Sequence, residues 1–122
     1  MTLTDKSGAA VRVAVNDAAS RYEIFVLDGE SETLAGFAEF IDRESGSAVP
    51  QRIIYHTEVP PEFGGRGLAG ILTEQELDHV RAIGKHVVPV CPVVAGFLKK
   101  HDGYADIADP VTPEILSALR SG

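Results

Sequence analysis

Three side chains that could move a proton or attack a carbonyl group lie on either side of a glycine-rich stretch. His56 and Glu58 precede that stretch, and Cys91, the single cysteine, follows it and is itself followed by Pro92. A carboxylate or an imidazole can take the proton of an attacking amine, and an imidazole titrates nearer neutrality. Because one residue separates His56 from Glu58, both lie on the same face of an extended strand.

Each of these residues has two explanations. Cys91 could accept an acyl group as a thiolate or exchange a proton, or it could be a small apolar core side chain. Glu58 could be the base that activates an amine, or a surface glutamate at a strand end. His56 could be the base, a relay, or a packed histidine. The sequence leaves these alternatives open.

The glycine-rich stretch predicts an anion-binding turn at the start of a helix. Glycine has no Cβ, so several backbone N–H groups of such a turn can point into one concavity. The first N–H groups of a helix have no partner within it, and the helix dipole adds positive potential there. A phosphate or pyrophosphate fits such a site. The residues concerned are Gly64, Gly65, Arg66, Gly67, Leu68, Ala69 and Gly70.

The hydrophobic pattern predicts the elements that position these residues. Alternating and short apolar runs predict strands at 11–16, 22–27, 33–42, 51–59 and 87–91, and helical spacing predicts helices at 67–83, 93–100 and from 112 onward. Short turns join the first four strands, which predicts an antiparallel meander. The helix at 67–83 makes strands 51–59 and 87–91 parallel, in a right-handed crossover. Residues 1–9 are predicted to be a loose tail, and residues 43–50 a polar loop.

Four residues within these elements carry additional signals. Gly36 indicates a bulge or a close packing point. Pro89 cannot donate to a sheet, so its strand is predicted to be an edge or to splay from its neighbour, leaving a gap for an extended ligand. Gly84 is predicted to end the helix. Glu76 falls in the apolar face of that helix, and we expect it to lie at the edge and reach water. The other residues of that face are Leu68, Ala69, Leu72, Val80 and Ile83.

The composition is that of one ordinary globular domain of 122 residues, with a core at about 11–107. One cysteine excludes an intrachain disulfide, and neither a membrane-spanning run nor a signal-peptide core is visible, so a cytoplasmic location is expected. The net charge of -7 argues against nucleic-acid binding and is compatible with a cationic substrate, although acidity also simply keeps a protein soluble. We expect no membrane partner, no metal, and a monomer or weak dimer.

The stretches H-T-E-V-P-P-E-F-G-G-R-G-L-A and V-P-V-C-P-V-V-A-G-F-L-K-K-H-D-G-Y resemble the GNAT superfamily of acetyl-CoA-dependent N-acetyltransferases. Within it, they resemble a subgroup of minimal single-domain proteins of about this length, over about 13–107. The superfamily signature has Gln or Arg, two free positions, Gly, one free position, then Gly or Ala. Its last four positions match Arg66 through Ala69, whereas Gly64 stands where the signature has Gln or Arg.

The resemblance implies an α+β fold of the GNAT type with α/β/α layers, and acetyl-CoA as the acyl donor. The backbone around Val59 would bind the pantetheine arm, and the N–H groups of residues 65–70 would hold the pyrophosphate. The helix after Cys91 would line the exit of the coenzyme with Phe97, Lys100 and His101. Cys91 is a proposed active-site residue of the subgroup, but direct transfer without an acyl-cysteine is the superfamily's usual route and is favoured here.

We therefore predict an acetyl-CoA-dependent N-acetyltransferase that acts on a primary amine, either a small amine or a protein lysine or N-terminus. One alternative is an acyl-CoA-binding module or interaction protein with little turnover, because so small a fold leaves little wall for a substrate pocket. Another is a phosphate-binding βαβ protein of a different kind. The sequence does not identify the acceptor.

Overall fold

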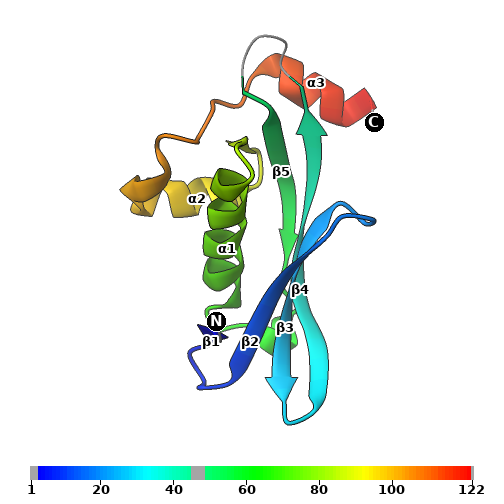
Figure 1. The fold of residues 1–122 in the computed structure, drawn as a ribbon, viewed down its shortest axis with the longest axis vertical. Coiled ribbons are helices and arrows are strands. Elements are labelled where there is room, and N and C mark those ends of the chain that lie inside the picture. The colour runs from blue at the N-terminus through cyan, green and yellow to red at the C-terminus, as the bar shows by residue number, and fades with distance from the viewer. Residues whose placement is uncertain (1–2, 45–48, 122) are drawn as a thin grey trace.

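A computed structural model describes residues 3–44 and 49–121; residues 45–48 of the predicted polar loop lie outside this range. Within these residues the chain forms one curled sheet with three α-helices and two 3-10 turns (Figure 1). In chain order the elements are β1 (Leu3–Thr4), β2 (Ala10–Asn16), β3 (Arg21–Asp28), β4 (Ser31–Arg43), β5 (Gln51–Glu58), η1 (Pro61–Phe63), α1 (Leu68–Ala82), β6 (His86–Pro89), α2 (Pro92–Lys100), η2 (Asp102–Tyr104) and α3 (Pro113–Ser121).

The sheet has the order β1-β2-β3-β4-β5-β6. Strands β2 to β5 pair antiparallel with their neighbours, and β5 pairs parallel with β6 across the α1 connection. The predicted meander and crossover are therefore confirmed. Helices α1 and α2 lie on one face of the sheet and α3 on the other (Figure 1). We call these the α1 face and the α3 face.

The predicted ends of α1 are nearly right. Gly84 takes a φ of +74°, and the next residue, Lys85, donates its N–H to the Val80 carbonyl, as in a glycine-terminated helix. The helix itself already ends at Ala82. Ile83, predicted to lie on the apolar face, is consequently 41% exposed.

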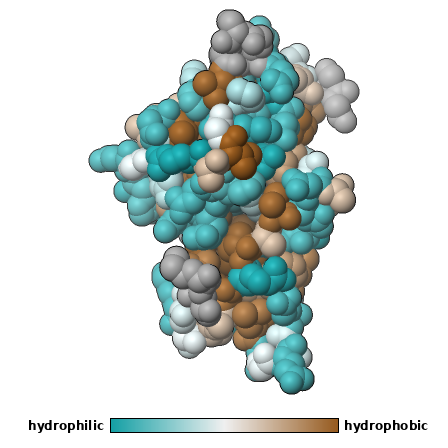
Figure 2. Space-filling model, in the orientation of Figure 1, coloured by the Kyte–Doolittle hydropathy of each residue, from teal (hydrophilic) through white to brown (hydrophobic). Residues whose placement is uncertain are grey.

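The main core lies on the α1 face and takes residues from the strands and from both helices on that side. A smaller cluster on the α3 face joins Ile53 and Val88 to Ile115 of α3. Figure 2 shows hydrophilic side chains over much of one face of the molecule, interrupted by apolar areas near the middle. The fully buried side chains of the main core are Val11, Tyr22, Ile24, Ala35, Ala38, Ile54, Leu68, Leu72, Leu77, Val80, Val87 and Val94.

Glu76 corrects the sequence prediction. Its side chain is completely buried, and neither of its carboxyl oxygens has a hydrogen-bond partner among the described residues. Burial raises its pKa to about 8. The helix face is broader than the apolar residues alone indicated, because α1 packs against β3, β4, β5, β6 and α2 together.

The predicted loose tail is also wrong for the part that the structure describes. Residues 3–9, which we call the N-terminal hook, add a short strand to the sheet, with Leu3 paired to Val11. The Asp5 carboxylate is inaccessible to solvent and accepts hydrogen bonds from Ser7, Ala9 and Arg66. Hydrogen bonding, chiefly from the Ser7 side chain, lowers the Asp5 pKa to about 2. The hook is therefore held by local bonds and by one contact from far along the chain.

Two register shifts shape the centre of the sheet. One lies beside Gly36, where an added Cβ would come within 2.9 Å of the Glu58 carbonyl oxygen, so this is the close packing point that the glycine predicted. The other leaves Tyr55 without a partner on β4, because Phe40 pairs with Ile54 and Glu39 with His56. This bulge reverses the alternation of β5, so residues after Tyr55 face the opposite side from that expected.

Candidate functional site

The parallel pairing of β5 and β6 ends early, as Pro89 predicted. The last pair is Ile54 with Pro89, and β5 then continues to Glu58 with partners on β4 only. Cys91 closes the ladder by donating its N–H to the Ile54 carbonyl at 2.9 Å. Beyond that bond the two strands diverge, and no strand among the described residues pairs with this edge of β5 from Tyr55 onward.

Cys91 lies at this strand gap, on the α1 face. The residue is only 2% exposed, and its thiol donates a hydrogen bond to the Thr57 hydroxyl at 3.2 Å. Sequence reasoning did not single out Thr57. The Tyr55 bulge explains its position, because without the extra residue Thr57 would face α3.

His56 and Glu58 lie together on the α3 face. Their side chains approach to 3.4 Å between Nε2 and Oε1, and they are 46% and 57% exposed. The His56 ring packs beside Phe37 of β4, with ring centroids 6.1 Å apart. The two candidate bases are thus on one strand face, as expected, while Cys91 is across the sheet from them.

The glycine-rich turn has the backbone geometry of an anion cradle. Gly65 and Gly67 take φ values of +77° and +76°, and Gly67 is the N-cap of α1, with no side chain to cap the first N–H groups. A Cβ at Gly70 would meet open space. In the described part of the chain, therefore, no side chain caps the first N–H groups of α1 by a hydrogen bond.

The side chains of the turn are largely committed to the fold. Leu68 is buried in the core, and Arg66 donates to the buried Asp5 carboxylate at 2.8 Å. Val59 follows β5 directly, with its Cγ2 3.0 Å from a Cβ placed on Gly36. An anion bound at this turn would therefore contact its backbone N–H groups, and the binding itself stays a prediction.

A groove of about 520 Å³ runs between the start of α1 and α2. Its wall combines apolar surface with cationic side chains, and it includes Gly70 from the glycine-rich stretch. It also includes Phe97, Lys100 and His101, the residues that the resemblance assigned to the exit of the coenzyme. The Phe97 ring stacks on the His101 ring at 4.0 Å. The lining residues are Lys6, Gly70, Thr73, Pro92, Val93, Gly96, Phe97, Lys100 and His101.

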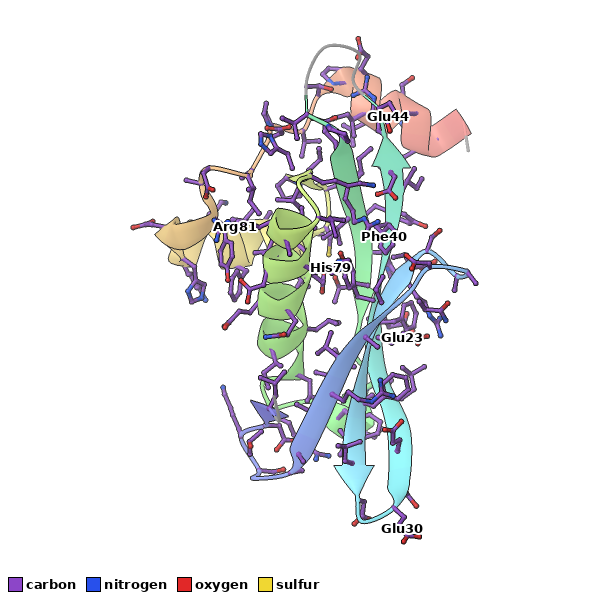
Figure 3. All side chains as sticks on the ribbon, in the orientation of Figure 1. Glu23, Glu30, Phe40, Glu44, His79 and Arg81 are labelled. Atoms are coloured by element: carbon purple, nitrogen blue, oxygen red, sulfur yellow. The ribbon has the colours of Figure 1, made fainter. Side chains whose placement is uncertain are left out.

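A second, smaller cavity of about 160 Å³ lies on the α1 face between β2, β3 and α1. Tyr22 and His79 line it, and their side chains share a hydrogen bond of 2.8 Å. Figure 3 labels His79 on α1 and Phe40 on β4, on the side of the helix that faces the strands. Burial raises the pKa of Tyr22 to about 12 and lowers that of His79. None of the residues singled out in the sequence lines this cavity.

The three glycines of the turn differ in a way that stability measurements can test. Gly64 is extended, with φ of -66°, whereas Gly65 and Gly67 are in the left-handed region. Replacing Gly65 or Gly67 by Ala should cost about 1–2 kcal/mol in the free energy of unfolding. Gly64→Ala is the matched control and should cost less, although its Cβ lies 3.2 Å from the Pro61 carbonyl oxygen. Urea denaturation measures all three; equal losses would contradict the turn geometry.

Comparison with known proteins agrees with this geometry. The model of a family described as GCN5-related N-acetyl-transferase matches residues 21–107. The chain belongs to this family. The matched range contains β3 to α2, and with them the strand gap, the glycine turn and most of the groove. No curated protein matches the sequence at a significant level.

A solved structure with the same fold is a mutant form of a cAMP-binding acyltransferase from Mycobacterium smegmatis. The match has a TM-score of 0.51 and 12% sequence identity, and it covers 98% of this chain and 52% of that chain. The chain thus spans about half the length of this structural neighbour. At this identity the likeness shows the fold, and confirms the predicted GNAT-like α+β architecture.

The described residues contain no cluster of three or more potential metal ligands. In the same residues, none of the helices combines the length and the apolar character needed to cross a membrane.

Proposed function

We propose that the protein transfers an acetyl group from acetyl-CoA to a primary amine. Membership in the acetyltransferase family gives the reaction class, acyl transfer. The observation that carries the proposal is the groove between α1 and α2. It brings Gly70 of the glycine-rich stretch, cationic side chains and the residue after Cys91 into one continuous surface.

The residues around the groove suit the parts of an acyl-CoA. The N–H groups at the start of α1 offer hydrogen bonds to a pyrophosphate. Lys100 offers positive charge, and His101 a ring N–H, for a further phosphate. The unpaired edge of β5 after Ile54 offers backbone groups to the amides of a pantetheine arm. The Phe97 and His101 rings add a flat surface. The gap at Cys91 and Thr57 would then hold the thioester.

The two sheet faces divide the chemistry. Acetyl-CoA approaches from the α1 face, and the amine from the α3 face, where His56 and Glu58 lie side by side. One of these two takes the amine proton as the nitrogen attacks the thioester carbonyl carbon. The C–S bond then breaks, and the departing thiolate takes a proton from solvent, to which the base passes the proton that it removed. Backbone N–H groups at the gap stabilise the developing oxyanion, and the remainder of the rate enhancement comes from holding both reactants in line.

A binding experiment followed by a turnover experiment tests the proposal. Calorimetry should show binding of acetyl-CoA and no comparable binding of ATP, which carries phosphates but no pantetheine arm. Addition of a panel of primary amines and lysine-bearing peptides should then release free CoA. Equal affinity for ATP and acetyl-CoA would instead support a general phosphate-binding protein.

The alternative is an acyl-CoA-binding module with little turnover. It is favoured by the exposure of His56 and Glu58, because no element in the described part of the chain builds a wall over them on the α3 face. It predicts tight acetyl-CoA binding without CoA release on any amine. The two functions differ only in this second measurement.

Replacement of Cys91 by Ala tests whether the thiol takes part in the reaction. For direct transfer we expect kcat to fall less than threefold, and no acetylated protein to be detected by mass spectrometry before the amine is added. Thr57→Val is the matched variant, because it removes the hydroxyl that accepts the thiol hydrogen bond. A fall in kcat of a hundredfold or more in Cys91→Ala, with a wild-type acetyl-cysteine intermediate, would overturn direct transfer.

A further inference from the structure

We propose that Lys6, in the N-terminal hook, binds the pyrophosphate of acetyl-CoA. It would take the role of the Gln or Arg that the family signature has at the position of Gly64. This inference rests on the proposed function, because it concerns the same groove. It adds a binding residue from a segment that precedes residues 21–107, the range that the family model matches.

The hook is attached directly to the glycine turn. The Arg66 side chain donates to Asp5 at 2.8 Å, and the Arg66 carbonyl accepts the Lys6 N–H at 2.9 Å. The second of these bonds ties the backbone of Lys6 to Arg66, the residue directly before the N-cap of α1. Because the Asp5 carboxylate also holds Ser7 and Ala9, both sides of Lys6 are restrained.

The side chain of Lys6 lies across Gly67. A Cβ placed on Gly67 would come within 3.1 Å of Lys6 Cε and 3.3 Å of Lys6 Cγ. The lysine stem therefore occupies the space that any larger N-cap residue would need. This contact gives Gly67 a second reason to be glycine, besides its positive φ.

The Lys6 ammonium group is available for an anion. Lys6 lines the groove, and no ion pair joins it to a carboxylate of the residues that the structure describes. Lys6 and Lys100 provide cations along the groove, with the His101 imidazole beside them, in a protein of net charge -7. Lys6 is the one of these three that lies against the start of α1, where the unpaired N–H groups and the helix dipole add to its potential.

Gly64 cannot take this role with a side chain, whereas the hook contacts the same turn at Arg66 and Gly67. The family signature places Gln or Arg at this position, four residues before the helix begins. Here that position has no side chain, and the ammonium group comes from Lys6, which reaches the same turn through its bond to Arg66. Lys6 thus offers a cation beside Gly67, three residues after the position of the missing signature residue.

Calorimetry with three acyl donors tests the assignment on the full chain. The donors are acetyl-CoA, its 3′-dephospho form, which keeps the pyrophosphate, and S-acetylpantetheine, which lacks it. Lys6→Met keeps the aliphatic stem over Gly67 and removes the charge. We expect it to weaken binding of the first two donors about tenfold, the loss of one charge-assisted hydrogen bond, and to leave S-acetylpantetheine unchanged. Lys6→Arg should restore most of the affinity.

Lys99→Met is the matched control, because it makes the same change in an exposed lysine that does not line the groove. It should leave all three affinities within twofold of wild type. Equal weakening in Lys6→Met and Lys99→Met would reduce the effect to net charge and overturn the proposal. So would a loss in Lys6→Met that disappears with the 3′-dephospho donor, since Lys6 would then contact the other phosphate.

Failure of the underlying function gives a different result. If wild-type protein binds none of the three donors, the proposed acyltransferase function is wrong. If wild type binds acetyl-CoA and Lys6→Met binds it equally well, only the role of Lys6 is wrong. Thermal melts of each variant without ligand separate loss of binding from loss of folding.

Discussion

The free energy of unfolding of the wild-type protein is expected to fall as pH rises from about 4.5 to about 8, and the Glu76→Gln variant is expected not to show this fall. In the folded protein the Glu76 carboxyl group is buried without a hydrogen-bond partner among the described residues, and burial raises its pKa from 4.5 to about 8. In the unfolded chain it ionises near its ordinary value. Between these two values the folded state holds one more proton than the unfolded state, so rising pH favours unfolding.

The size of this effect follows from the same linkage. Each pH unit in the interval costs about 1.4 kcal/mol, so the loss reaches several kcal/mol, on the order of 3–5, by pH 8. A small domain has only about 5–15 kcal/mol of stability in total, so the change is large. Above the folded pKa of about 8 the decline should level off.

The effect of neighbouring titratable groups on the pH dependence of stability must be distinguished from that of Glu76. Burial lowers the pKa of His79, so below about pH 6.5 this residue binds more protons in the unfolded chain than in the folded protein. Its contribution to the free energy of unfolding therefore rises with pH in that range. Arg52 donates to both Asp42 and Tyr22 and stays charged throughout. Glu76→Gln should therefore reverse the slope below pH 6.5, because the His79 contribution is then no longer masked.

Urea denaturation at intervals from pH 4.5 to pH 9 measures these slopes. Glu74→Gln is the control, since it makes the same change at an exposed position two residues away on α1. It should keep the wild-type slope. A flat or rising wild-type profile between pH 6.5 and pH 8 would contradict a buried neutral Glu76. Glu76→Met, which removes the polar atoms altogether, should be more stable than wild type at pH 8.

The sequence predicted the elements that depend on local signals. Alternation located the strands, and Gly84 and Thr112 marked helix ends because each acts through neighbouring backbone groups. The Thr112 hydroxyl indeed accepts the Ile115 N–H at 3.3 Å. The glycine turn was visible for the same reason, since positive φ is a property of single residues.

What the sequence did not reveal depends on contacts between distant segments. Asp5 and Arg66 are 61 residues apart, so nothing near Asp5 indicated that the tail would be ordered, except a turn-forming Asp-Lys-Ser-Gly run. Glu76 is buried because five elements surround α1, which a helical pattern cannot show. The Tyr55 bulge depends on how β4 and β5 align, and it alone decides which side chains meet at the gap.

That bulge gives the proposed base its position and leads to the second large expected effect. Because Tyr55 reverses the alternation, His56 and Glu58 lie on the α3 face, while Cys91 and Thr57 lie on the α1 face. A base should lie on the side from which the amine arrives. An exposed carboxylate that touches an imidazole at 3.4 Å can take the proton and pass it to solvent.

Glu58→Gln is accordingly expected to lower kcat by about 10²–10³-fold, with the affinity for acetyl-CoA unchanged. The pH profile separates a base from a structural residue. Without a base, transfer depends on amine that is already neutral, so the rate should rise about tenfold per pH unit until the pKa of the amine, near 10.4 for a lysine. Wild type should level off well before that pH.

His56→Gln and Glu30→Gln complete the test. Glu30 lies in the β3–β4 turn, remote from the gap (Figure 3), and Glu30→Gln should match wild type in rate and pH profile. If Glu58 is the base, His56→Gln should lower kcat by less than Glu58→Gln and keep the plateau. If His56→Gln instead removes the plateau while Glu58→Gln keeps it, the base is His56 and Glu58 only positions its ring. Because the two side chains touch, the double variant should be no slower than the slower single variant, as expected for residues that act on one proton.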